Sequence, residues 1–275
     1  MQYLPFPVSA EVDEAEVIKI TKKPEWEAQQ VAWIAAYRAY REHGGSPFAV
    51  APHDFGAGVR DSQYNLYDNR KGSGELRRMR RKEGLKSCPV CGSPVTGDLD
   101  HYLPRTNYPE FSIMRANLVP ACTHCNSGAK GAKVHGGDPR RFIHPYFDTW
   151  AAQPIWHVEI TPPFKAARFL PQTLPNLEEL QSEIVAFHLE NVLGIQFDLS
   201  MANEWSSLPV QIKLRDAELN TASVTSQIGN ELQVALAARG NNSWQAALLR
   251  GILCNPEAIE YLRHEAIGTT LPPQV

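Results

Sequence analysis

Four of the five cysteines form two Cys-x-x-Cys pairs, a spacing typical of zinc sites. Cys88 and Cys91 make the first pair, CPVC, and Cys122 and Cys125 make the second, CTHC. A gap of two residues lets both thiolates of a pair turn toward one tetrahedral centre. A disulfide framework is the alternative, but the chain is long, shows no secretory signal and has an odd number of cysteines. We therefore predict a structural Zn²⁺ held by four cysteines, and we assign no role to Cys254.

The segment between the two pairs carries residues suited to metal-assisted hydrolysis. Asp100 and the amide oxygen of Asn126 are hard ligands for Mg²⁺ or Mn²⁺, and they leave coordination positions for water and phosphate. His101, beside the metal, is suited to take a proton from the attacking water. Asn117 is expected to hold His101, or its loop, in the orientation that the reaction needs. If zinc pins both ends of the segment, Asp100, His101 and Asn126 converge although they lie far apart in the sequence.

These spaced elements resemble the HNH (ββα-metal) endonuclease superfamily. The matching elements are Cys88-x-x-Cys91, Asp100-His101-x-x-Pro104, Asn117-Leu118-x-Pro120, Cys122-x-x-Cys125-Asn126 and Lys130. The resemblance implies that His101 is the general base, that Asn117 is structural, and that Asp100 and Asn126 hold Mg²⁺ or a similar ion. The chain departs from the family at the third motif position, where Asn126 stands in place of histidine. The resemblance covers residues 86–135 and implies DNA as the substrate.

A finer similarity is carried by two further runs, DHYLPRTNYPEFS at 100–112 and FIHPYFD at 142–148. Both are similar to HNH proteins that are paired with ABC/SMC-like ATPases in bacterial phage-defence systems of the Septu type and in related retron systems. This similarity implies an effector nuclease in antiviral defence, with an ATPase as its partner.

The positive charge of the chain is concentrated directly before the first cysteine pair. The whole chain has a net charge of −3, but residues 70–86 contain eight basic and two acidic side chains, a net of +6. By default such a run is the solvated face of a helix. Its position favours contacts with a nucleic-acid backbone, which would weaken as salt rises. The residues assigned to these contacts are Arg77, Arg78, Arg80, Arg81 and Lys82, together with Lys130 as a phosphate contact.

The hydrophobic pattern predicts an α+β protein, with a zinc-stapled ββα-metal module set in a mostly helical chain. We expect residues 1–24 to be irregular with a short strand at 16–20, a helix over 24–44, a loop over 45–69 and a helix over 74–84. The runs IWHVEI and ARFL predict strands, and residues 176–195, 209–240, 243–253 and 256–267 predict helices. The expected division is an N-terminal segment 1–69, a basic helix with the metal module at 70–150, and a mainly helical region 151–275.

The composition excludes some classes of protein. The chain of 275 residues is 43% hydrophobic, which rules out wholesale disorder, and it has no apolar run of about 18 residues that would span a bilayer. Because the first residues also lack a basic signal-peptide region, we expect a cytoplasmic protein. The alternative to a nuclease is a non-catalytic zinc module that docks nucleic acid or a protein partner. Both functions predict the four-cysteine site, but only the nuclease predicts a second, weaker metal site at Asp100 and Asn126.

Overall fold

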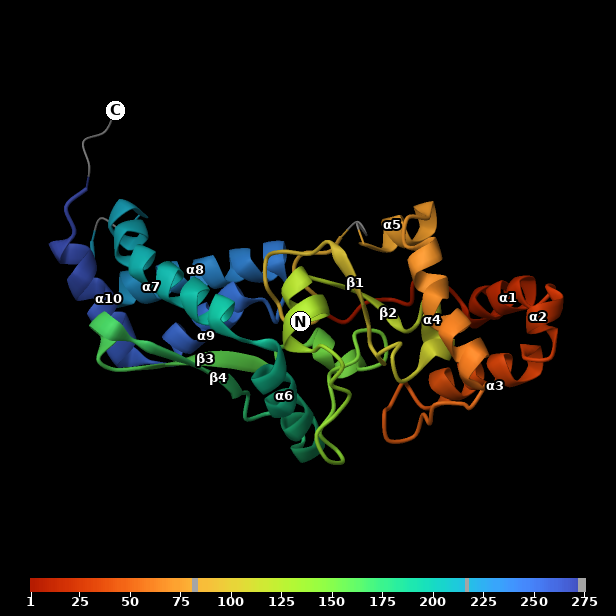
Figure 1. Ribbon diagram of the computed structural model, residues 1–275. Helices are drawn as coiled ribbons and strands as arrows, with labels where there is room; N and C mark the ends of the chain where they lie inside the picture. The colour runs from red at the N-terminus through yellow and green to blue at the C-terminus, as the bar shows by residue number, and fades with distance from the viewer. Residues whose placement is uncertain (81–83, 216–217, 272–275) are drawn as a thin grey trace.

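The chain folds into an elongated molecule in which the two cysteine pairs lie near the middle (Figure 1). The computed structural model describes residues 1–80, 84–215 and 218–271. Helices of the N-terminal third form one end, and the C-terminal helices with a long hairpin form the other. Within the described residues the protein is a mixed α/β structure, mostly helical, with two small two-stranded sheets. None of the helices in these ranges is long and apolar enough to cross a membrane.

The N-terminal end contains more helix than the sequence pattern predicts. The helices are α1 (Ala10–Ile20), α2 (Pro24–Glu27), α3 (Gln30–Glu42), α4 (Ala57–Arg70) and α5 (Gly74–Arg80). The strand expected at 16–20 is wrong, because those residues are the last turns of α1. The loop expected over 45–69 is also wrong, because α4 occupies its second half. The helix expected over 24–44 is divided into α2 and α3, and the helix expected over 74–84 is described as α5, with residues 81–83 outside the described ranges.

The α1 helix was missed because a carboxylate takes an apolar position on its buried face. Asp13, Val17 and Ile20 are the buried residues of α1, at the spacing of one helical face. Asp13 is 1% exposed and accepts hydrogen bonds from the guanidinium groups of Arg41 and Arg115. Because Arg41 lies in α3 and Arg115 lies between the cysteine pairs, this carboxylate ties the N-terminal helices to the middle of the molecule.

The middle of the molecule is a short hairpin followed by a helical turn. Strands β1 (Asp98–His101) and β2 (Leu118–Ala121) pair antiparallel, with Asp100 opposite Val119 and His101 opposite Leu118. A single 3-10 turn, η1 (Pro109–Phe111), lies in the connection between the strands. The second cysteine pair opens a short helical stretch that includes the π-helical turn η2 (Cys125–Ala129). This helical stretch carries Asn126 and ends directly before Lys130.

The C-terminal end consists of a hairpin covered by helices. The elements are β3 (Trp156–Thr161), β4 (Arg168–Thr173), α6 (Glu179–Val192), α7 (Ile195–Arg215), α8 (Thr221–Arg239), α9 (Trp244–Leu253) and α10 (Pro256–Gly268), with 3-10 turns η3 (Thr149–Ala152) and η4 (Phe164–Ala166). Both predicted strands are confirmed, and they pair antiparallel. The single helix expected over 209–240 is wrong: Pro209 lies inside α7, and the chain turns before α8 begins at Thr221.

Hydrogen bonds join the segment that spans the two cysteine pairs to both ends of the molecule. The Trp244 indole N–H of α9 donates to the Cys91 carbonyl at 2.7 Å, and His188 Nε2 of α6 donates to the Val90 carbonyl at 2.7 Å. On the other side, the Trp33 indole N–H of α3 donates to the Glu110 carbonyl at 2.8 Å. One cluster of buried apolar side chains runs through all three of the expected segments. The segment with the two cysteine pairs is therefore part of one continuous core with both ends of the molecule.

Candidate metal centre and hydrolytic pocket

The four predicted cysteines meet in one buried cluster. Their sulfur atoms all lie within 4.8 Å of one another, and the Sγ atoms of Cys91 and Cys122 are 3.7 Å apart. Metal–sulfur bonds of about 2.3 Å in a tetrahedron require sulfur–sulfur edges of roughly 3.8 Å. The cluster therefore has the dimensions and donor set of a structural zinc site. Cys254, in contrast, is exposed and lies outside the cluster.

The electrostatics of the cluster favour a bound cation. Hydrogen bonds from Cys125, Cys88 and Cys91 hold the pKa of the Cys122 thiol far below its ordinary value. The same hydrogen bond to Cys122 raises the pKa of Cys125 far above its ordinary value, since one thiol of the pair must keep its proton. Buried thiolates repel each other in a medium of low dielectric constant. A divalent cation at the centre removes this conflict and lets all four sulfurs bind as thiolates.

The first knuckle has a glycine where the backbone requires one. Gly92 follows Cys91 with φ +83°, in the left-handed region, and its N–H donates to the Cys88 carbonyl at 2.8 Å. A β-carbon at this position would overlap the Asn242 carbonyl oxygen just before α9. Gly92 therefore allows both the tight turn of the first cysteine pair and the close approach of the C-terminal helices.

Asp100, His101 and Asn126 line one pocket of about 270 Å³. The first two come from the end of β1, and Asn126 comes from the first turn of η2. The antiparallel pairing sets Ala121 of β2 opposite Asp98 at the start of β1. The η2 turn that follows packs back against β1, which brings Asn126 into the same pocket as Asp100 and His101. The expected convergence of these three residues is therefore seen. The remaining wall of the pocket includes Tyr64 and Tyr67 of α4 and the loop residues Pro104, Arg105 and Thr106.

The His101 ring is held in one orientation by its neighbours. Its Nε2 lies 2.9 Å from the Ser112 carbonyl oxygen, which can only accept a hydrogen bond, so Nε2 carries the proton. In a neutral ring Nδ1 is then the atom with a free lone pair. Burial lowers the pKa of His101 to about 3, against the opposing effect of the Ser112 hydrogen bond. The Tyr67 ring packs edge-on against the imidazole, with 4.6 Å between ring centroids.

Asn117 is a structural residue of the loop that carries Ser112. The side chain is fully buried, and its Oδ1 accepts from the Leu103 backbone N–H at 2.8 Å and from the Tyr40 hydroxyl at 3.0 Å. Its Nδ2 donates to the carbonyl groups of Leu103 and Phe111. These bonds fix both ends of the loop between His101 and Ser112. Asn117 therefore acts on the His101 ring indirectly, through the position of the Ser112 carbonyl, and does not line the pocket.

The side chain of Lys130 does not lie at the surface, where a phosphate contact was expected. It is 3% exposed, and its Nζ lies 3.0 Å from Asp100 Oδ2 and 2.6 Å from the His101 carbonyl oxygen. The ammonium group is thus used inside the protein, where it joins the end of η2 to the end of β1. Burial raises the pKa of Asp100, and the ion pair with Lys130 opposes that rise. The ion pair engages the Oδ2 atom of Asp100.

Only some of the side chains that were predicted to contact nucleic acid from the basic helix are exposed. Arg77 and Arg78 of α5 are exposed, whereas Arg80 donates to the Tyr67 hydroxyl and the Lys71 carbonyl. Arg81 and Lys82 lie outside the described residues. Because Tyr67 also lines the pocket, its bond with Arg80 joins the end of α5 to the wall that faces Asp100 and His101.

Sequence reasoning missed the α4 wall of the pocket and Arg105. The Arg105 guanidinium lies 4.1 Å from the Tyr64 ring centroid and donates to Asp68 Oδ2 at 2.6 Å. Tyr64 and Asp68 are one helical turn apart, a spacing that only becomes informative once 57–70 is known to be a helix. With Lys130 buried against Asp100, Arg105 is the cationic side chain that lines this pocket among the described residues.

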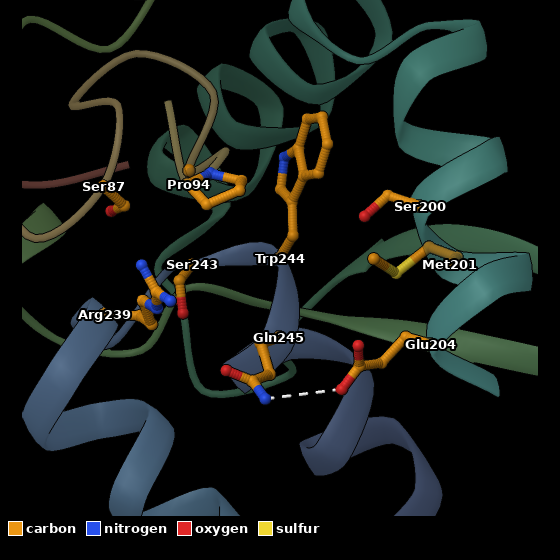
Figure 2. Close-up of a pocket in the computed structure, with 10 residues that line it drawn as sticks. Ser87, Pro94, Ser200, Met201, Glu204, Arg239, Ser243, Trp244 and Gln245 are labelled. Atoms are coloured by element: carbon orange, nitrogen blue, oxygen red, sulfur yellow. Dashed lines mark hydrogen bonds between the residues drawn. The ribbon is translucent and has the colours of Figure 1, made fainter. Parts of the chain in front are cut away.

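A second hollow of about 200 Å³ lies between the first knuckle, α7 and α9 (Figure 2). Trp244 forms its wall, and Gln245 donates to Glu204 across it at 3.4 Å. None of the residues predicted to act in hydrolysis lines this hollow.

Comparison with known proteins gives a similarity confined to one segment. The chain is 47% identical over 64 residues to Protein ea31 of Escherichia phage lambda. The match covers 23% of this chain and 22% of that protein, so the chain spans about a fifth of its length. No protein-family profile matches the chain, and no solved structure matches it significantly.

Proposed function

We propose that this protein is a metal-dependent endonuclease of the HNH type that hydrolyses phosphodiester bonds in DNA. The observation that carries the proposal is the single pocket lined by Asp100, His101 and Asn126, beside a buried four-cysteine cluster. The donor set fits a hard divalent cation, since a carboxylate oxygen and an amide oxygen are the ligands that Mg²⁺ and Mn²⁺ prefer. Asp100 and Asn126 would hold this ion, which when bound supplies positive charge to the phosphate and the leaving oxygen.

His101 acts in this scheme as the general base. The Ser112 carbonyl fixes the Nε2-protonated tautomer, so that Nδ1 carries the lone pair that takes a proton from water. The water oxygen forms a bond to phosphorus as the bond to the 3′ oxygen breaks, and the leaving oxygen is protonated by solvent. The Asn117 hydrogen bonds hold the loop that orients the ring.

Arg105 acts as the phosphate-binding residue. Its guanidinium is positioned by Asp68, by the Tyr64 carbonyl and by the Tyr64 ring, so little conformational freedom remains to be lost when a phosphate binds. Guanidinium groups suit phosphate because their planar donors match its oxygens. In this proposal Arg105 takes the role that the sequence assigned to Lys130.

A plasmid assay tests the function directly. Purified protein is incubated with supercoiled plasmid and Mg²⁺ or Mn²⁺, alongside His101→Ala and an EDTA control. We expect nicked or linear plasmid from the wild type, a loss of about 100-fold or more for His101→Ala, and no cleavage in EDTA. His135→Ala is the matched control, because His135 is an exposed histidine outside the pocket. Equal cleavage by wild type and His101→Ala would contradict the proposed role of His101.

The similarity to nucleases that work with ABC/SMC-like ATPases adds a second arm to this assay. We propose that such an ATPase is the partner in antiviral defence, so the plasmid assay is repeated with the partner and ATP present. Cleavage that appears only in this arm would support a nuclease that its partner activates. If DNA binds but is not cut in either arm, while zinc remains bound, the result would favour the non-catalytic zinc module.

A further inference from the structure

The FIHPYFD segment, which the proposed reaction leaves without a role, packs against both strands of the hairpin that carries His101. The Tyr102 hydroxyl, next to His101 in the chain, donates to the Phe142 carbonyl at 2.7 Å. The Tyr146 hydroxyl donates to the carbonyl of Leu118, the residue opposite His101 in the hairpin, at 2.9 Å. The described residues of this segment lie outside the hydrolytic pocket, so the segment acts on that site indirectly.

His144, at the centre of the segment, is fully buried, and its hydrogen bonds select one tautomer. Its Nδ1 accepts from the Tyr146 backbone N–H at 3.2 Å, and a backbone N–H can only donate. Nδ1 therefore carries no proton, and in a neutral ring the proton lies on Nε2. Nε2 lies 2.9 Å from the Tyr40 hydroxyl oxygen, so His144 donates to Tyr40.

The Tyr40 hydroxyl carries the direction of this bond on to Asn117. Tyr40 lies in α3 and is fully buried, and because its oxygen accepts from His144, its own hydrogen is available to donate. The acceptor is Asn117 Oδ1, at 3.0 Å, which also accepts from the Leu103 backbone N–H. A backbone N–H thus fixes each end of this relay, and every group between the two ends has a single donor or acceptor role.

The relay ends beside the group that orients the His101 ring. Asn117 Nδ2 donates to the Phe111 carbonyl at 3.3 Å, and Phe111 directly precedes Ser112, whose carbonyl fixes the His101 tautomer. The Tyr40 ring also packs edge-on against the Phe111 ring, with 4.9 Å between the centroids. Tyr40 therefore holds the loop that ends at Ser112 both by its ring and, through Asn117, by its hydroxyl.

Gly45 lies against both aromatic members of the relay. Its φ is +66°, in the left-handed region, and a β-carbon there would lie 2.9 Å from the Tyr40 hydroxyl and from His144 Cδ2. The Gly45 N–H also donates to the Tyr40 carbonyl at 2.8 Å. The turn after α3 is therefore packed closely around the two side chains and leaves them little room to move.

We propose that Tyr40 and His144 are positioning residues of the hydrolytic site. Through Asn117 they hold the loop that ends at Ser112, and this loop holds the His101 ring in one orientation. The inference rests on the proposed role of His101 as general base. Because a misplacement of about 1 Å can cost a factor of about 100 in rate, loss of one bond of the relay should lower the rate of cleavage more than it lowers DNA binding.

Tyr40→Phe tests the relay, because it removes the hydroxyl and keeps the ring. We expect kcat for plasmid cleavage to fall about 10-fold or more, with KM little changed. Tyr37→Phe is the matched control: Tyr37 is a buried tyrosine of the same helix, and its hydroxyl has no hydrogen-bond partner among the described residues. This variant should cleave like the wild type. Equal rates for the two variants would overturn the proposal.

Two substitutions of His144 separate positioning from packing. The amide nitrogen of Gln reaches the place of Nε2 and can donate to Tyr40, whereas the amide oxygen of Asn reaches the place of Nδ1 and can accept from the Tyr146 N–H. Each variant keeps one of the two bonds of His144 and loses the other. We expect His144→Gln to retain most of the wild-type rate and His144→Asn to lose about 10-fold or more. Equal losses would mean a general loss of packing and would contradict the relay.

Nuclear magnetic resonance of the His101 ring tests the positioning without any cleavage. In the wild type we expect one Nε2-protonated tautomer, whose proton exchanges slowly with water because it is bound to the Ser112 carbonyl. The signal is assigned by its absence from His101→Ala. Exchange should be several-fold faster in Tyr40→Phe and unchanged in Tyr37→Phe. If the wild type cuts no DNA but shows this difference, the nuclease proposal fails and the positioning of His101 stands. An unchanged exchange rate in Tyr40→Phe overturns the relay, whether or not the protein cuts DNA.

Discussion

The ion pair between Lys130 and Asp100 stabilises a buried carboxylate at the point where catalysis is proposed. Both side chains are almost completely buried, and Lys130 also donates to the His101 carbonyl. Removal of one partner of a buried pair leaves an uncompensated charge and typically costs 3–5 kcal/mol. We therefore predict that Lys130→Met lowers the free energy of unfolding by about 3 kcal/mol in urea denaturation.

The double variant Asp100→Asn with Lys130→Met is the control for that prediction, since it removes both charges. It should recover a large part of the lost stability, although the proposed cation site would be damaged in both variants. Losses that simply add in the double variant would mean that the two groups do not interact across the 3.0 Å that separates them.

Arg105 is predicted to act on the substrate phosphate. Replacing it with Gln removes the positive charge from the pocket, and we expect cleavage to fall about 100-fold, with a weaker dependence of DNA binding on salt. Arg140→Gln is the control, because Arg140 is exposed and lies outside the pocket. DNA binding is measured by anisotropy in EDTA, so that an effect on binding is seen even if cleavage is absent. Unchanged binding and cleavage would exclude Arg105 as the phosphate contact.

Sequence analysis identified the residues that line the site more completely than the side chains that contact them. The two Cys-x-x-Cys pairs predicted a cluster that the structure contains, and Asp100, His101 and Asn126 do line one pocket. Lys130 is buried, although a lysine in a polar, glycine-rich segment is expected to be exposed. Only the three-dimensional position of Asp100, one strand away, shows that the ammonium has a buried partner.

Among the elements, the packing of α9 on β3 depends on a single glycine. A β-carbon at Gly251 would overlap the Val158 carbonyl oxygen of β3, and backbone atoms on both sides cannot move independently of their helix and strand. We predict that Gly251→Ala lowers the free energy of unfolding by about 2 kcal/mol or more. Gly229→Ala in α8 is the matched control, because nothing lies within 4 Å of its added methyl group. The control should gain roughly 0.5–1 kcal/mol from helix propensity, and equal effects at the two sites would contradict the close contact.

The elements that sequence analysis missed share a physical cause. In α4 the buried face carries Gln63 and Tyr67 beside Leu66, and in α1 it carries Asp13, so the apolar period is incomplete in both. The buried carboxylate of Asp13 is compensated by arginines from distant segments, which the local sequence pattern does not reveal. The strands β3 and β4 and helices α9 and α10 were predictable because their patterns are regular and their ends carry turn or capping residues, such as the Asn255 cap of α10.

Across the whole molecule, three buried histidines are neutral in the native state and join separate parts of the chain. Burial lowers the pKa values of His101 and His188 to about 3 and holds that of His144 well below its ordinary value. His188 of α6 receives a hydrogen bond from the Ile143 N–H at 3.0 Å and donates one to the Val90 carbonyl in the first knuckle. Its ring can make both bonds only when one nitrogen is protonated and the other is not.

The whole molecule should therefore lose stability in acid below the ordinary histidine pKa. In the unfolded chain His188 binds a proton below about pH 6.5, whereas in the folded chain it resists protonation down to about pH 3. Between these values unfolding takes up a proton, so stability falls with decreasing pH by as much as about 1.4 kcal/mol per unit for each such histidine.

In His188→Asn the amide oxygen can accept the Ile143 N–H but cannot titrate. We predict a lower stability near pH 7 and a shallower fall toward pH 5, measured by urea unfolding with zinc present. His264→Asn removes an exposed histidine and should keep the wild-type slope. If His188→Asn and the wild type lose stability in parallel, His188 is not one of the groups through which acid unfolds the protein.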